Sequence, residues 1–312
     1  MHLLLSQLPR PIVLAAVAFA SLPAPALFAG TPDKSVVAAG PPARPAVESR
    51  FDTDFNFSAP ANFTGSVDAG KISSTSVRAT FNETFNISQA FSARWLVGWE
   101  EYWFSAQNSS GIIPNRMMTV FAGIGAEFRF GSGWLVRADF VPGIASDFDD
   151  ITWDDLVYNV RATVGYRFSK SLTVFAGVSV QPQFEFPVLP YVGAIWQIND
   201  KWKFNGTFPK ASLEYALTDS WVLYGAGNFR AARFRTSDTL GQSSGDSSLN
   251  NQWLSYMDVQ AGIGVAYKAG KHARFSVEAG SSLFRRFDYD EPDVAVNAGP
   301  AAYAGASMSF NF

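Results

Sequence analysis

Arginines at alternate positions are the residues of this sequence best suited to attract a small charged solute. Arg161 and Arg167 lie six residues apart in one alternating segment, and Arg137 lies in the segment before it. Because side chains an even number of residues apart point the same way on a strand, Arg161 and Arg167 share a face. Guanidinium groups gathered on one face attract anions when water reaches them. The spacing therefore predicts a candidate anion-attracting face made of Arg137, Arg161 and Arg167.

The other charged residues that alternate with apolar ones carry both signs. If every apolar face points outward, the inward set is Arg78, Glu127, Arg129, Arg137, Asp139, Arg161, Arg167, Lys203, Glu214, Asp258, Arg274 and Glu278. A ring of one sign indicates ion selectivity, whereas mixed signs are typical of ion pairs that fill a narrow barrel. Any one of these residues is therefore better explained by an internal ion pair, and only the three arginines form a local excess of one charge.

Catalysis and metal binding have few candidate residues. The chain has no Cys, and its one His beyond the first 29 residues, His272, falls in a short turn after Lys271. Outer-membrane hydrolases need a His base beside a Ser or Asp at the opposite rim. The acidic segment 146–155 could hold a divalent cation through its carboxylates, but its spacing matches no calcium-loop template. We expect a solvated loop there, no enzymatic activity, no catalytic residue, no metal site and no cofactor.

The first 29 residues have the pattern of an export signal. Arg10 precedes an apolar run over 12–20, and small residues at Ala24, Ala26 and Ala29 are typical of a cleavage site. Pro23 and Pro25 end the apolar run below the ~20 residues that a membrane helix needs. Residues 30–48 are rich in Pro and Ala and indicate a flexible lead. The expected organisation is a signal peptide over 1–29, a flexible periplasmic lead over 30–48 and one folded domain over 49–312.

That domain is rich in hydrophobic residues, at 47% of the chain, yet after residue 29 it has no apolar run of membrane-helix length. Instead of such a run, the domain has segments in which apolar and polar residues alternate. In the segment 156–168, "LVYNVRATVGYRF", apolar residues occupy every second position, and 77–88 repeats the pattern. A period of two indicates a strand with one apolar and one polar face. Soluble strands average about 5–6 residues, whereas runs of ten to fourteen have the length of tilted membrane-crossing strands.

The connections between these runs alternate in length. Short turns at 131–133, 169–170, 199–200, 218–220 and 269–271 alternate with longer polar stretches at 106–116, 146–155, 236–252 and 287–295. Outer-membrane barrels have short periplasmic turns and long outer loops. We therefore predict an all-β fold, an antiparallel transmembrane β-barrel with strands near 51–58, 74–88, 91–105, 117–130, 133–145, 156–168, 171–184, 188–198, 201–208, 211–218, 221–235, 253–268, 271–286 and 296–312.

The number of strands depends on Pro209. Proline is tolerated in a sheet only at an edge, a strand end or a bulge, so a turn at Pro209 and Lys210 gives fourteen strands. If 201–218 were one bent strand, a barrel of twelve strands would become possible after another re-pairing of the strands.

Aromatic residues support the membrane interpretation. Trp134, Trp196, Trp202 and Trp221 lie close to the short turns, as do Phe130, Tyr166, Phe168 and Phe208. Such rings favour the headgroup level and form girdles in barrels.

The chain ends in an alternating segment whose apolar side includes Met308, Phe310 and Phe312. A final strand with a terminal Phe resembles the signal by which the barrel-assembly machinery recognises its substrates. In a closed barrel this strand pairs with the first. We therefore predict that the three residues face lipid at the closing seam and act in assembly.

Residues 189–227 carry a more specific resemblance. The order Pro190, Gly193, Asn199, Trp202, Phe208-Pro209, Tyr215 and Gly225 resembles a family of bacterial outer-membrane barrels whose domain has no known function. That family is distantly similar to the barrels associated with aromatic-hydrocarbon degradation, and the resemblance is best over 180–312. It implies a barrel in the outer membrane and assigns no site residue.

Three functions remain open at this stage. The first is a pore or transporter for a small, unidentified solute. The alternatives are a non-conducting structural barrel with a salt-bridged lumen and a barrel for uptake of hydrophobic compounds, although the lead is too short and Pro-rich to form the plug domain of known fourteen-stranded uptake barrels. Without the signal, 24 − 1 = 23 basic residues face 27 acidic ones. The net charge of −4 argues against nucleic acid, and leaves outer-membrane lipid, the assembly machinery and a solute as expected partners.

Overall fold

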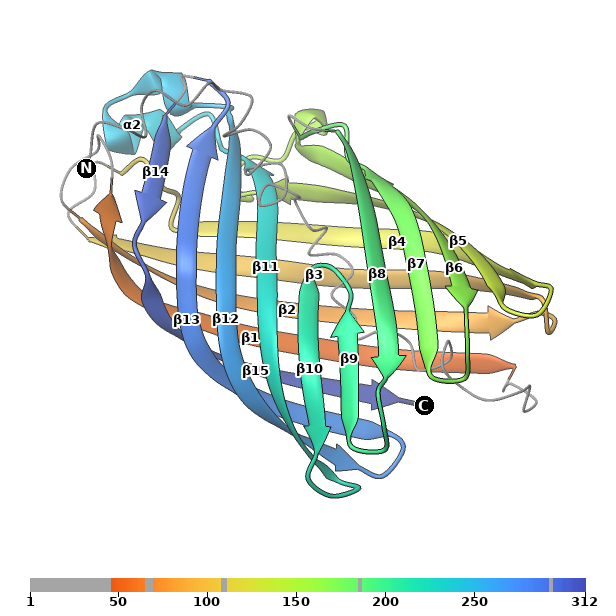
Figure 1. Ribbon diagram of the computed structural model, residues 1–312. Coiled ribbons are helices and arrows are strands. Elements are labelled where there is room, and N and C mark those ends of the chain that lie inside the picture. Colours follow the sequence, from red (N-terminus) through yellow and green to blue (C-terminus); the bar gives the residue numbers. More distant parts are fainter. Residues whose placement is uncertain (1–45, 65–69, 108–110, 185–186, 292–293) are drawn as a thin grey trace, which may run out of the picture.

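The computed structural model describes residues 46–64, 70–107, 111–184, 187–291 and 294–312. Within them the chain forms a single antiparallel barrel (Figure 1). Its strands are β1 (Val47–Thr64), β2 (Lys71–Asn86), β3 (Phe91–Gln107), β4 (Arg116–Phe130), β5 (Trp134–Ser146), β6 (Leu156–Arg167), β7 (Leu172–Val180), β8 (Val188–Gln197), β9 (Trp202–Gly206), β10 (Lys210–Ala216), β11 (Trp221–Arg235), β12 (Trp253–Ala269), β13 (Ala273–Tyr289), β14 (Ala295–Ala298) and β15 (Ala301–Asn311).

The barrel is closed by the two ends of the chain. β15 pairs with both β13 and β1, and Phe310 lies opposite Phe51 across the seam. β14 pairs with the same two strands, so β14 and β15 are one barrel position that is interrupted at Gly299 and Pro300. The predicted fold of fourteen positions is confirmed, and the predicted last strand over 296–312 is corrected to two segments. Among the described residues, no helix is long and apolar enough to cross a membrane.

The turn at Pro209 is present. β9 and β10 pair as a hairpin from Ala211–Gly206 to Tyr215–Trp202, which excludes the bent single strand. Several predicted boundaries change, two of them with consequences for the domain limits and the loops. β7 ends at Val180 rather than at 184, and β1 begins at Val47, so the last two residues of the predicted lead belong to the barrel. The predicted signal peptide and the lead up to residue 45 lie outside the described residues.

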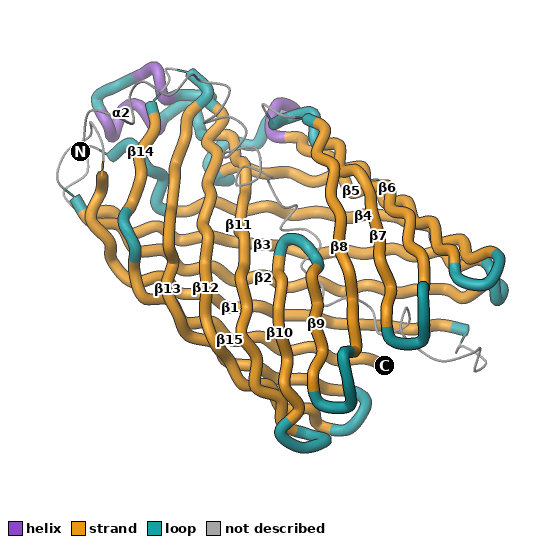
Figure 2. The backbone as a smooth tube through the Cα atoms, viewed as in Figure 1, coloured by secondary structure: helices purple, strands orange, loops and turns teal. Residues whose placement is uncertain are grey.

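Figure 2 shows short turns at one end of the barrel and longer loops with the short helices at the other. The long-loop end, called the outer end below, carries η3 (Trp153–Asp155), α2 (Leu240–Ser244) and η4 (Ser247–Leu249). The short-turn end carries a band of outward-facing aromatic residues: Trp134 stacks near Phe130 and Tyr166, Trp202 contacts Tyr215, and Trp221 contacts Tyr267. Phe208 is not part of this band, because it lies at the opposite end of the β9–β10 hairpin and packs on Phe229.

The outward-facing side chains are apolar over most of the wall, as the alternation predicts. Ile124, Val192 and Ile263 are exposed by 65%, 76% and 71%, as positions that contact lipid must be. On β6 the exposed positions include Leu156, Tyr158, Val160, Ala162 and Val164. The inward positions between them are buried or half-buried.

A hydrophobic core occupies the barrel interior near the outer end. Its rings and aliphatic chains come from ten strands and two loops: Ala61, Ile72, Tyr102, Phe104, Ile112, Ile113, Met117, Ala145, Val157, Phe234, Leu249, Leu254, Tyr256, Phe287, Tyr289, Val296 and Ala298. Phe104 contacts Tyr256 and Phe287 with ring centroids 5.0 Å apart, and Phe287 has no exposed surface. Edge-on aromatic contacts at this spacing are favourable and close-packed. We call this cluster the outer core.

Candidate functional site: the charged lumen

Directly below the outer core, the side chains that face the lumen become polar. Asn56 on β1 and Gln260 on β12 exchange two amide hydrogen bonds of 3.2 Å and 3.0 Å. Gln260 also donates to Asp258 over 2.7 Å, and Ser282 donates to the other carboxylate oxygen over 2.6 Å. Buried amides and carboxylates are stable only when their hydrogen bonds are made. This polar layer is therefore an ordered part of the wall.

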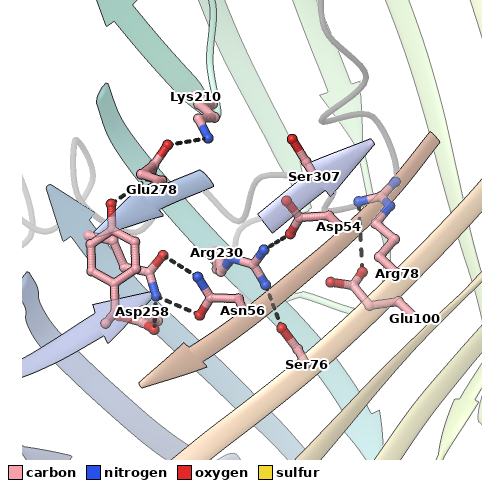
Figure 3. Close-up of polar contacts among 12 residues, drawn as sticks. Asp54, Asn56, Ser76, Arg78, Glu100, Lys210, Arg230, Asp258, Glu278 and Ser307 are labelled. Carbon is pink, nitrogen blue, oxygen red and sulfur yellow. Dashed lines mark hydrogen bonds and ion pairs between the residues drawn. The ribbon is translucent and has the colours of Figure 1, made fainter. Parts of the chain in front are cut away.

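The next layer is crossed by ion pairs between strands that are not neighbours (Figure 3). Arg230 on β11 donates to Asp54 on β1 and, over 2.6 Å, to Ser76 on β2. Lys210 on β10 pairs with Glu278 on β13 over 2.8 Å, and Tyr303 donates to the same carboxylate over 2.5 Å. These contacts reach across the interior, so the lumen is narrow at this height.

A recess lies between these pairs. It is lined by Asp54, Asn56, Lys210, Tyr224, Asn228, Arg230, Ser276 and Glu278, together with residues 305–307 of β15. Both signs of charge and five uncharged hydrogen-bonding side chains face it. The recess can therefore hold water or a polar group, and charge alone does not select its occupant.

The three arginines of the predicted anion face come from adjacent strands but do not meet at one point. Arg161 lies opposite Asp139 in the β5–β6 ladder, and Arg137 lies 3.3 Å from the same carboxylate. Arg167 is at the short-turn end of β6, opposite Thr173 of β7. A fourth arginine that the sequence analysis did not single out, Arg94 on β3, binds Asp139 over 2.5 Å. One buried carboxylate thus faces Arg94, Arg137 and Arg161, which leaves this side of the lumen positive.

The remaining inward charges are mostly paired, as the mixed signs predict. Arg78 pairs with Glu100, Arg129 with Glu127 and Arg274 with Glu214. Asp54, Glu100, Lys210, Arg230 and Arg285 were not in the predicted inward set. Lys210 and Arg230 alternate with apolar residues as the others do, so the signal for these two was present in the sequence. Arg285 was obscured because β13 has a register shift opposite Val259 and Gln260, which exchanges the two faces.

The acidic segment 146–155 is held by hydrogen bonds within its own loop and to the connection between β11 and β12. Asp147 accepts the Ser237 N–H over 2.8 Å and Asp155 accepts the Thr152 N–H over 2.8 Å as part of a capping box. Burial raises the pKa of the Asp155 carboxyl, and the Thr152 hydrogen bond partly opposes that shift. Within the described part of the chain, no three acidic, His or Cys side chains gather as a metal site would require. His272 lies in the β12–β13 turn with Nδ1 3.0 Å from the Asn311 carbonyl oxygen.

The model of a protein family, the domain of unknown function DUF6268, matches residues 99–297. The chain belongs to this family. The match begins well before the 180–312 region in which the sequence resemblance is best, so most of the barrel belongs to the family domain. No curated protein matches the chain.

Solved structures similar to the chain are outer-membrane barrels. The COG4313 outer membrane channel from Pseudomonas putida F1 is 9% identical, with 86% of this chain and 97% of that chain covered and a TM-score of 0.43. The P. putida toluene transporter TodX is 9% identical, with 86% and 90% covered and a TM-score of 0.38. The KdgM porin is 9% identical, with 84% and 99% covered and a TM-score of 0.33. The likeness is one of fold.

Proposed function

We propose that the protein is an outer-membrane channel or transporter for a small solute, exported by a cleaved signal peptide and inserted by the barrel-assembly machinery. The observation that carries the proposal is the charged lumen below the outer core, with its recess beside Lys210 and Arg230. A barrel with only a structural role needs no excess of one charge in its interior. The positive side formed by Arg94, Arg137 and Arg161 around Asp139 supports passage of anions over cations.

Conductance in planar bilayers tests the proposal. The reversal potential is measured in a salt gradient for the natural protein and for the double variant Arg161→Gln and Arg167→Gln. We expect conduction with a preference for anions, and a lower anion-to-cation permeability ratio in the variant. The matched control is Arg286→Gln, which removes an arginine paired with Asp288 near the outer rim. An unchanged reversal potential in a conducting double variant would remove these two arginines from the pathway.

A second candidate is a barrel that conducts nothing. The outer core supports it, because side chains from ten strands pack together across the interior near the outer end. The two candidates differ in a simple way. A non-conducting barrel shows no current in folded, heat-modifiable protein at any voltage, whereas a gated channel shows discrete current steps.

A further inference from the structure

The two ion pairs that border the recess share one feature: in each pair, one partner is buried and the other is open to the lumen. In the pair between β11 and β1, the Arg230 side chain is 12% exposed and the Asp54 side chain 36%. In the pair between β10 and β13, Glu278 is 6% exposed and Lys210 is 37% exposed. All four residues line the recess (Figure 3). The charges most open to a solute there are therefore one carboxylate and one ammonium group.

The open carboxylate keeps an acceptor atom for a solute. Among the described residues, Asp54 accepts a side-chain hydrogen bond only from Arg230, through Oδ1. An ionised carboxylate accepts through both of its oxygens. Oδ2 of Asp54 is therefore left to accept a hydrogen bond from a solute or from water in the recess.

The open ammonium group keeps donors in the same way. Nζ of Lys210 lies 2.8 Å from Oε2 of Glu278 and 5.7 Å from the centre of the Tyr224 ring. The other oxygen of Glu278 accepts the Tyr303 hydroxyl over 2.5 Å, so this carboxylate is held on both sides. An ammonium group has three N–H donors, and the bond to Glu278 uses one of them. The others are left for an acceptor in the recess.

The rest of the lining is uncharged and close to these groups. The hydroxyl oxygens of Ser276 and Ser307 lie 2.6 Å apart, and the Asn228 amide comes from β11. These side chains can bind further polar atoms of an occupant without adding charge. The space between the lining residues is at most about 250 Å³, with the open lumen beside it included, which limits the occupant to a short molecule.

The charges of the recess sum to zero, so their arrangement and not their net value discriminates between occupants. An anion bound at Lys210 also lies near Glu278, and a cation bound at Asp54 also lies near Arg230. A molecule that carries both charges places each end on an opposite charge and adds no net charge to a half-buried site. Because charges away from bulk water are costly unless they are paired, this arrangement favours a zwitterion over an ion of either sign.

We propose that the recess is a binding site for a small zwitterion, such as an amino acid, with its ammonium group on Asp54 and its carboxylate on Lys210. Both ends then form charge-assisted hydrogen bonds, which are stronger than those of neutral groups. This inference rests on the proposed channel function, because a solute reaches the recess along the lumen, and it names the class of solute.

Saturation-transfer NMR on refolded, heat-modifiable barrel in nanodiscs tests the site without requiring current. The zwitterions are glycine, 3-aminopropanoate and 4-aminobutanoate, whose charges are increasingly far apart. Glycinamide and glycolate have nearly the shape of glycine but keep only the positive or only the negative charge, and arabinose is the uncharged polar probe. We expect at least one zwitterion to bind at least about tenfold more tightly than glycinamide, glycolate and arabinose, a difference of about 1.4 kcal/mol. Equal binding of a singly charged probe or of arabinose would overturn the proposal.

A double variant locates the binding in the recess. Asp54→Asn with Lys210→Gln removes both open charges and nearly keeps the size of the side chains. We expect binding of the zwitterion to weaken at least about tenfold. The matched control, Arg286→Gln with Asp288→Asn, removes an exposed ion pair near the outer rim and should leave binding unchanged. Unchanged binding in the folded recess variant would also overturn the proposal, and if this variant does not fold, the comparison of probes on the natural protein decides.

Binding and conductance can fail separately. Selective binding of a zwitterion by a barrel that carries no current would support the site and contradict the channel. Anion currents in a barrel that binds no zwitterion more tightly than the singly charged probes would support the channel and overturn the site.

Discussion

Arg230 and Asp54 join β11 to β1 across the interior, although β12, β13 and β15 separate these strands in the sheet. The guanidinium also holds Ser76 on β2. A contact of this kind fixes the width of the barrel at one height, because strand ladders alone set only the spacing between neighbours.

Removing the Asp54 carboxylate should weaken this contact across the lumen. In Asp54→Asn the guanidinium, whose side chain is 12% exposed, keeps Ser76 and loses its counter-charge. We expect a loss of about 1–3 kcal/mol in the free energy of unfolding, toward the lower end because the Asp54 side chain is 36% exposed. Urea unfolding of refolded barrel in lipid measures it. Asp288→Asn, which breaks an exposed pair with Arg286, should cost less than about 1 kcal/mol; equal losses would contradict a special role for the cross-lumen pair.

The outer core should respond as the interior of a soluble protein does. Phe287→Ala removes a fully buried ring between Phe104 and Tyr256, and large-to-small changes of this kind cost about 3–5 kcal/mol. The cavity should also raise the single-channel conductance, because the core narrows the lumen toward the outer end. Val136→Ala on the lipid face is the control for both measurements. A strongly destabilised variant with unchanged conductance would show that the core does not limit the current.

Glycines beneath lumenal tyrosines should be intolerant of a side chain. A Cβ at Gly262 would lie 2.3 Å from the Tyr303 hydroxyl and 2.6 Å from the Ala279 carbonyl oxygen. Gly262→Ala should therefore displace Tyr303 from Glu278, and the fraction of heat-modifiable protein should fall. Gly227→Ala is the matched change, since no atom lies within 4 Å of its added Cβ. Similar folding yields for the two variants would argue against close approach at Gly262.

The terminal residue should matter for the rate of assembly. Phe312 exchanges backbone hydrogen bonds with Ser49, the shorter of them 2.9 Å long, while its side chain is 73% exposed. Its deletion therefore removes little buried area, and folded barrels should keep near-normal heat modifiability. Pulse-chase should reveal slower insertion, with proteolysis of periplasmic intermediates. Insertion at the natural rate would contradict an assembly role for Met308, Phe310 and Phe312.

The sequence predicts most of the wall because one face of each strand contacts lipid. Apolar residues therefore recur at every second position along the strand. The β6 pattern from Leu156 to Arg167 is an example. The outer core was missed because it breaks that period: Tyr102, Trp103 and Phe104 are apolar on both faces of β3, and the inward pair joins the core. Consecutive apolar residues within an alternating strand could have indicated it.

The site was harder to predict than the wall. Inward orientation follows from alternation, which places Arg137, Arg161 and Arg167 on the lumenal side. Partners across the interior do not follow, because Arg94–Asp139 and Arg230–Asp54 depend on how the closed sheet folds over itself.

The outer core also gives this barrel an unusual response to temperature. Its rings leave protein contact and become hydrated on unfolding, so they contribute a positive heat-capacity change, as in a water-soluble domain. Such stabilisation weakens on cooling, whereas the backbone ladders around it do not depend on apolar hydration. Cold should therefore loosen the packing of the outer core before it affects the strand ladders that surround it.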